Sequence, residues 1–94
     1  MLGKKEATNI YNTRRNTHAW YTTNRYEGLR DTHMLPRLTI DEQKVISACV
    51  TGPGESEKNL GKYSDMTPYE SRQALISLIE QELITYGPIE DWML

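Results

Sequence analysis

The chain has 94 residues, a length that supports one modest hydrophobic core but not two. Apolar residues make up 37% of it, Phe is absent, and most of the large rings are tyrosines with a polar tip, so the core is expected to be thin. The net charge of −2 argues against a general polyanion binder, and a single cysteine, Cys49, excludes an internal disulfide.

The first part of the chain, residues 1–36, is a basic and aromatic-rich arm. Over residues 1–38 seven Lys and Arg stand against three acids, a net charge of +4. The arm shows neither a sustained helical period nor clean alternation, and its Thr and Asn disfavour helix interiors. The run His18–Tyr26 has strand-like composition, and Glu27-Gly28 after it is a candidate turn. We therefore expect an irregular or partly extended arm.

Residues 37–94 are predicted to form an acidic helical domain with a C-terminal tail. Beyond residue 38 four Lys and Arg stand against ten acids, a net charge of −6. The sequence Thr39-Ile40-Asp41-Glu42 is a capping box, which indicates a helix start. An apolar stripe follows it, and Thr51-Gly52-Pro53-Gly54 ends the helix, because Gly favours a left-handed cap and Pro cannot continue a helix.

Two more helices are expected in this domain. A short one covers residues 55–63, and the longest begins at a second capping box, Thr67-Pro68-Tyr69-Glu70. The apolar face of this long helix must pack on a partner, for which the helix after Thr39 is the natural candidate. A short extended stretch follows from Ile84. Together the elements predict a mainly α fold, a small three-helix, helix-turn-helix-like body with an irregular or partly extended N-terminal arm and room for one short hairpin.

The order of helix, Gly-Pro turn, short helix, turn and long helix ending in Leu83-Ile84 resembles the core of winged-helix DNA-binding proteins over residues 38–86. The most similar piece runs from Ser71 to Ile84. The resemblance implies that the long helix lies in the major groove. The groove-facing candidates would be Thr67, Tyr69, Glu70, Arg72 and Gln73, with Ser77 at the edge of this set, and those chosen as contacts are Thr67, Tyr69, Arg72 and Gln73. A plain three-helix bundle would give the same pattern, and that alternative stays open.

Cations and aromatic rings alternate in the arm, a combination that single-stranded nucleic-acid binders use for phosphate attraction and base stacking. A basic arm also gives some helical DNA-binding modules affinity in the minor groove. In the alternative, the rings complete a small core and the arginines stay in water. The candidate nucleic-acid contacts of the arm are Arg14, Arg15, Arg25 and Arg30, among the rings of Tyr11, Trp20, Tyr21 and Tyr26.

The sequence shows no recognisable motif for catalysis or metal binding. His18, His33 and Cys49 do not stand at metal-ligand spacings, and Cys49 lies on a helical apolar stripe, as a small buried hydrophobe does. We therefore expect no enzyme, no metal and no cofactor. The lone cysteine and the polar start of the chain favour a reducing, cytoplasmic location without signal peptide or membrane span.

Two functions fit these features. The first is a small regulatory protein that contacts nucleic acid through the arm and the helix after Thr67, with a homodimer as a way to join two apolar faces. The alternative is a protein-binding module, such as a small viral or plasmid-borne factor that inhibits a host protein through its acidic body. Its candidate partner contacts are Trp20, Tyr21, Trp92 and Met93. Trp92 could also fold back to finish the core.

Overall fold

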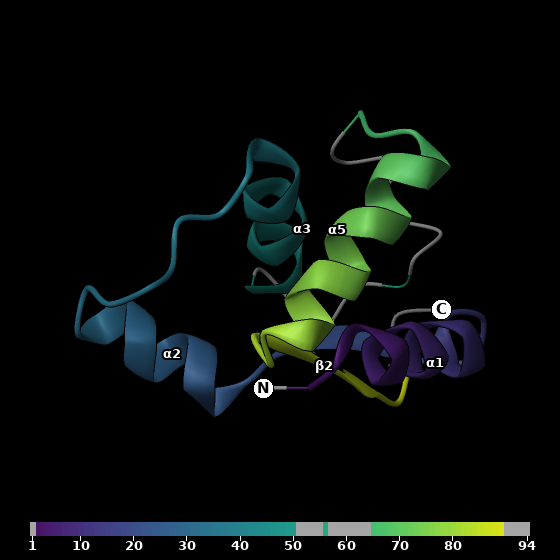
Figure 1. Cartoon of the computed structure of the whole chain (residues 1–94), viewed down its shortest axis with the longest axis horizontal. Coiled ribbons are helices and arrows are strands. Elements are labelled where there is room, and N and C mark those ends of the chain that lie inside the picture. The colour runs from purple at the N-terminus through teal and green to yellow at the C-terminus, as the bar shows by residue number, and fades with distance from the viewer. Residues whose placement is uncertain (1, 51–55, 57–64, 90–94) are drawn as a thin grey trace.

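The computed structural model describes residues 2–50, 56 and 65–89. In this part of the chain the fold is mainly α, as predicted, with a two-stranded antiparallel sheet. Figure 1 shows α3 and α5 standing beside each other above the sheet, with α1 in front of it and α2 projecting to one side. The elements in chain order are α1 (Lys4–Arg14), β1 (Ala19–Thr22), α2 (Asn24–Asp31), α3 (Ile40–Val50), α5 (Pro68–Glu80) and β2 (Ile84–Gly87).

Both predicted capping boxes are present. At α3 the amide of Glu42 donates to the Thr39 hydroxyl at 3.1 Å, and the amide of Thr39 donates to the Glu42 carboxylate at 2.9 Å. Thr67 and Glu70 make the same reciprocal pair at the start of α5, with Pro68 at the first helical position. The local signals therefore fixed both helix starts. The predicted stop at residues 51–54 and most of the predicted short helix lie outside the described residues.

The arm differs from the prediction. Its extended part is confirmed as β1, but an irregular course is wrong for α1 and α2, and Glu27-Gly28 lies inside α2 instead of forming a turn. Thr23 caps α2 by accepting from the Tyr26 amide. The apolar positions of these helices are few, and tertiary contact overrides their weak propensity.

The two strands lie far apart in the sequence, with α2, α3 and α5 between them. They pair from Ala19 with Gly87 to Thr22 with Ile84, so the sheet is a long-range pairing and the expected local hairpin is not what forms it. A Cβ at Gly87 would lie 2.7 Å from the Tyr21 ring, which explains a glycine at the end of β2.

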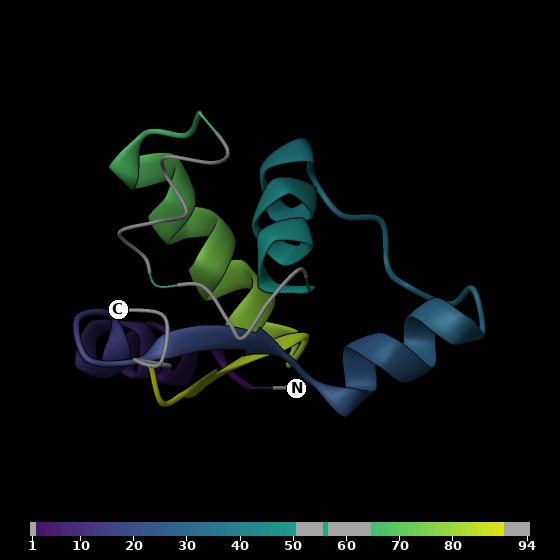
Figure 2. The same cartoon turned by 180° about the vertical axis from the view of Figure 1, so that it is seen from behind.

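One hydrophobic cluster joins α1, β1, α3, α5 and β2. The helix α1 runs back along α5, since the Leu2 amide donates to the Glu80 carbonyl at 3.1 Å. Figure 2 shows the sheet beneath the lower ends of α3 and α5. Among the described helices, none has the length and apolar character to cross a membrane. The largest fully buried side chains are Trp20, Tyr11, Leu75, Leu78 and Leu83.

Candidate nucleic-acid interface

Three arginines from two distant segments meet on tyrosine rings. The Arg14 guanidinium lies 4.6 Å from the centre of the Tyr86 ring. The guanidinium groups of Arg15 and Arg72 lie 5.2 Å and 5.9 Å from the centre of the Tyr11 ring. We call these five residues the arginine–tyrosine cluster. It joins the end of α1, β2 and the first half of α5.

Two buried rings, Tyr11 and Trp20, position this cluster. Tyr11 is fully buried and stacks on Trp20, with ring centres 6.4 Å apart. Arg15 follows Tyr11 by one helical turn, so both point to the same face of α1. The antiparallel course of α1 along α5 then carries Arg72 to the same ring. His18 meets Tyr86 edge-on at 5.4 Å, beside Arg14.

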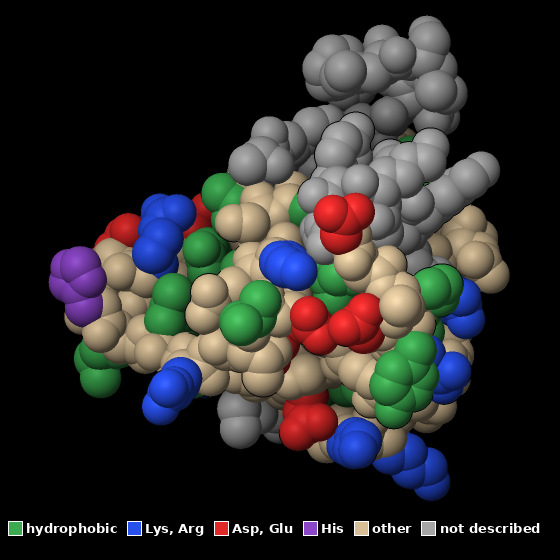
Figure 3. Space-filling model, turned by 90° about the horizontal axis from the view of Figure 1, so that it is seen from above, with side chains coloured by type: hydrophobic (Ala, Val, Ile, Leu, Met, Phe, Trp, Pro, Cys, Tyr) green, Lys and Arg blue, Asp and Glu red, His purple; other side chains and the backbone are tan. Residues whose placement is uncertain are grey.

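The charges of Arg14 and Arg72 are not compensated by carboxylates in the described part of the chain, where the ion pair is that of Arg30 with Asp31. Arg72 is exposed and Arg14 is half-buried. A guanidinium placed over an aromatic ring at an exposed site gains about 0.5–1 kcal/mol, and the contact uses the face of the group and not its N–H donors. Figure 3 shows several Lys and Arg side chains at the lower right edge of one face, with others at its left and centre and Asp and Glu side chains between them.

The first half of α5 presents the other candidate contacts. Tyr69, Arg72 and Gln73 are exposed on one face, and the Tyr69 side chain is 71% exposed. From Ala74 to Ile79 the helix is buried except at Ser77. Thr67 serves as the helix cap, so its hydroxyl is already accepting a hydrogen bond from Glu70. The accessible face of α5 therefore lies at its N-terminal end.

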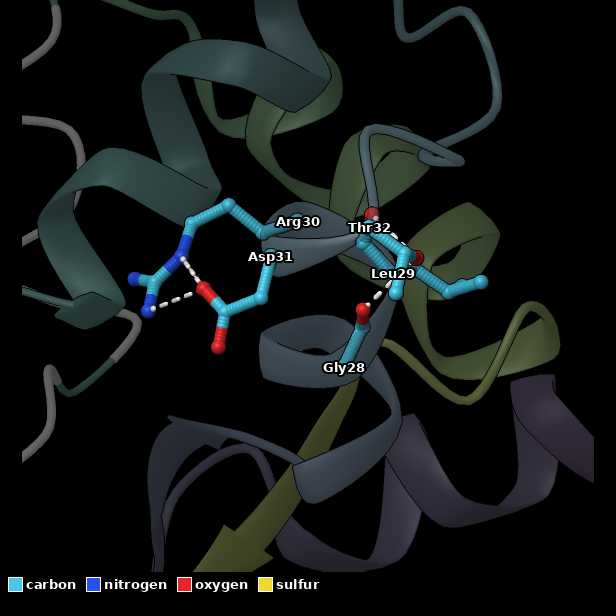
Figure 4. Close-up of polar contacts among 5 residues, drawn as sticks. All are labelled: Gly28, Leu29, Arg30, Asp31 and Thr32. Atoms are coloured by element: carbon cyan, nitrogen blue, oxygen red, sulfur yellow. Dashed lines mark hydrogen bonds and ion pairs between the residues drawn. The ribbon is translucent and has the colours of Figure 1, made fainter.

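The arginines of α2 lie elsewhere. Arg25 donates from Nε to the carbonyl of Gln81 at 3.2 Å, just beyond the C-terminal end of α5. Arg30 donates twice to Asp31, at 3.3 Å and 3.2 Å (Figure 4), and lies over the Tyr26 ring. The structure thus brings Arg14, Arg15 and Arg72 together but leaves Arg25 and Arg30 at the other end of α5.

The candidate contacts of the protein-binding alternative are placed differently. Trp20 is fully buried, so its ring is not accessible to a partner. The Tyr21 hydroxyl donates to the carbonyl of Pro88. Trp92 and Met93 lie outside the described residues. Sequence reasoning missed Tyr86, because its place beside Arg14 depends on the pairing of β2 with β1, for which no local signal exists.

A second polar cluster holds α3 against the end of α5. The Glu42 side chain accepts from the Ser77 hydroxyl at 2.7 Å and from the Gln81 side-chain amide at 2.9 Å, in addition to the Thr39 amide. Burial raises the pKa of Glu42, but the hydrogen bonds of Thr39, Ser77 and Gln81 together lower it below its ordinary value. This buried carboxylate is thus kept charged by its donors.

Among the described residues, His, Cys, Asp and Glu do not form a group of three that could hold a metal ion. No family model, no curated protein and no solved structure matches the chain.

Proposed function

We propose that the protein is a small non-enzymatic regulatory protein that binds nucleic acid through the arginine–tyrosine cluster and the start of α5. One observation carries this proposal. Arg14 and Arg72 come from opposite parts of the sequence, stack on tyrosine rings at one edge, and have no carboxylate partner in the described part. Arg30, by contrast, is paired with the neighbouring Asp31 on the surface.

The chemistry of stacked arginines supports phosphate as the ligand. Stacking fixes the plane of the guanidinium, while its N–H groups remain able to donate two parallel hydrogen bonds to a phosphate. Less side-chain entropy is lost on binding when the fork is already held in place. The cluster would therefore position a nucleic-acid backbone and would not by itself read its sequence.

The exposed end of α5 supports a second, base-directed contact. Tyr69 and Gln73 flank Arg72 on the accessible face, and the side-chain amide of Gln can bond to a base edge. A helix presented by its N-terminal residues is also the arrangement that the helix-turn-helix resemblance implies. We therefore extend the proposed interface from the cluster to Tyr69 and Gln73.

A salt titration of binding to random-sequence DNA tests the proposal. The double variant Arg14→Ala/Arg72→Ala is expected to lower the slope of log K against log salt by about 2, because two phosphate contacts are lost. Arg25→Ala/Arg30→Ala removes the same charge from the other end of α5 and serves as the matched control, with an unchanged slope.

Two results would contradict the proposal. If the intact protein shows no affinity for nucleic acid at low salt, the protein-binding alternative takes its place. If the two double variants lose affinity equally, binding follows the total charge of the chain and the cluster has no special role.

A further inference from the structure

Tyr69 stands apart from the other aromatic residues of the fold. Its side chain is 71% exposed, and in the described part it takes part in no side-chain hydrogen bond or ring contact. Tyr11 and Trp20 are fully buried, and Tyr26 is 9% exposed. A large ring left in water in a protein with a thin core has no evident role in stability.

The position of Tyr69 relates it to the arginine–tyrosine cluster. It precedes Arg72 by one helical turn on α5, so the two side chains are neighbours on the same face. Arg72 in turn lies over Tyr11, beside Arg15. An exposed ring therefore stands one helical turn from the exposed Arg72, whose guanidinium lies over Tyr11.

This neighbourhood favours a strand whose bases are unpaired. In a duplex each base face is covered by the next base pair, whereas an unpaired base can stack on a protein ring while its phosphate meets an arginine. Glu70, next to Tyr69 in the first turn of α5, keeps a negative charge, because hydrogen bonds from Thr67 lower the pKa of its carboxyl. That charge repels the phosphates of either form, but base stacking, which only an unpaired strand offers to a ring, does not depend on charge.

Resting on the proposed function, we infer that the cluster takes single-stranded nucleic acid, with one base stacked on the Tyr69 ring and the adjoining phosphates at Arg72 and Arg14. Tyr69 is then the residue that distinguishes an unpaired strand from a duplex. The arginines supply the affinity that both forms share.

The test compares three labelled ligands by fluorescence anisotropy: oligothymidylate of about 15 nucleotides, a duplex of equal length and an abasic oligomer of equal length. The intact protein is expected to bind the oligothymidylate most tightly. Tyr69→Ala is expected to weaken that binding about tenfold, because one stacked base is lost, and to leave the abasic oligomer unaffected. Tyr69→Phe keeps the ring and is the matched control, with affinity near that of the intact protein.

The outcomes separate this inference from the proposed function. Equal or tighter binding of the duplex overturns the single-strand inference, and so does a Tyr69→Ala variant that binds oligothymidylate normally or weakens on the abasic oligomer to the same extent. In these cases a loss of affinity in Arg14→Ala/Arg72→Ala would still support the proposed function. Absence of binding to all three ligands overturns both. Circular dichroism of each variant verifies that the fold is kept.

Discussion

The arginines at the two ends of α5 carry the same charge but have different surroundings. At the α2 end, Arg25 is bonded to the Gln81 carbonyl and Arg30 to Asp31, and the nearby Glu42 bonds to the Gln81 side chain. At the α1 end, the guanidinium groups of Arg14 and Arg72 lie over tyrosine rings and have no ion-pair partner in the described part of the chain. At one end of α5 the arginines are therefore bonded to a carbonyl or a carboxylate, and at the other they lie over rings. Position in the fold, and not the count of basic residues, decides which cations can meet a ligand.

The largest effect on stability is expected at Trp20, whose ring packs against Tyr11 of the arginine–tyrosine cluster. Trp20→Ala removes a fully buried indole beneath Tyr11 and should lower the free energy of unfolding by about 3–5 kcal/mol in urea denaturation. Trp20→Phe keeps a ring and discards an indole N–H that has no partner in the described part, so its loss should be smaller. Equal losses of stability in Trp20→Ala and Trp20→Phe would mean that the stacking of Tyr11 on Trp20 does not support the cluster.

The next largest effect on stability is expected at Glu42, which links α3 to the C-terminal end of α5. Glu42→Ala removes the acceptor of the Ser77 hydroxyl and one acceptor of the Gln81 amide, which still donates to the Ser77 carbonyl, and should cost about 1–3 kcal/mol. The half-buried Glu70, which has the same capping-box role but no hydrogen bond to a second helix among the described residues, is the matched control, and Glu70→Ala should cost less. A similar loss in both would show that the cap, and not the link to α5, is what Glu42 supplies.

The Glu42 carboxylate predicts how the stability of the protein changes with pH. Its pKa is lower in the folded than in the unfolded chain, so its contribution is present above the unfolded value, near 4.5, and is lost as pH falls through the folded value. Unfolding followed from neutral to acidic pH should show this loss in the intact protein. It should be reduced in Glu42→Gln, which has no such proton to take up.

Two single substitutions, Arg25→Ala and Arg14→Ala, test the difference between the two ends of α5 directly. Arg25→Ala should lower stability by about 0.5–1 kcal/mol, since it removes a cation from the carbonyl end of α5, and should leave nucleic-acid affinity unchanged. Arg14→Ala should weaken binding and reduce its salt dependence. Thermal unfolding and anisotropy measured on both variants would contradict the comparison if the two effects were exchanged.

The smallest effect is expected in α2. His33 follows this helix with a positive φ of 57°, and the amide of Met34 closes the turn on the Leu29 carbonyl at 2.8 Å. Glycine adopts this conformation without strain, so His33→Gly should raise stability by about 0.5 kcal/mol despite its greater freedom in the unfolded chain. Binding should not change. A destabilised variant would show that the His33 side chain makes a contribution of its own.

The sequence predicted what depends on neighbours in the chain. Both capping boxes, at Thr39 and Thr67, are reciprocal bonds between residues three apart, so the helix starts followed from local pattern. The helix α1 was missed because its Thr and Asn are poor helix formers, and contacts with α5 outweigh them. The site was half predicted. Arg14, Arg15 and Arg72 were named, but their meeting on Tyr11 and Tyr86 depends on long-range packing that no local pattern contains.

The pairing of β1 with β2 has a kinetic consequence. Because the strands lie far apart in the sequence, their register forms only after a long loop has closed, which is a slow step in folding. Arg14 precedes the first strand and Tyr86 lies in the second, so the two come together only in molecules that have passed this step. Partly folded chains in which only the capped helices have formed would lack the arginine–tyrosine cluster. The rate at which nucleic-acid binding appears after dilution from denaturant would therefore report the rate at which β1 pairs with β2.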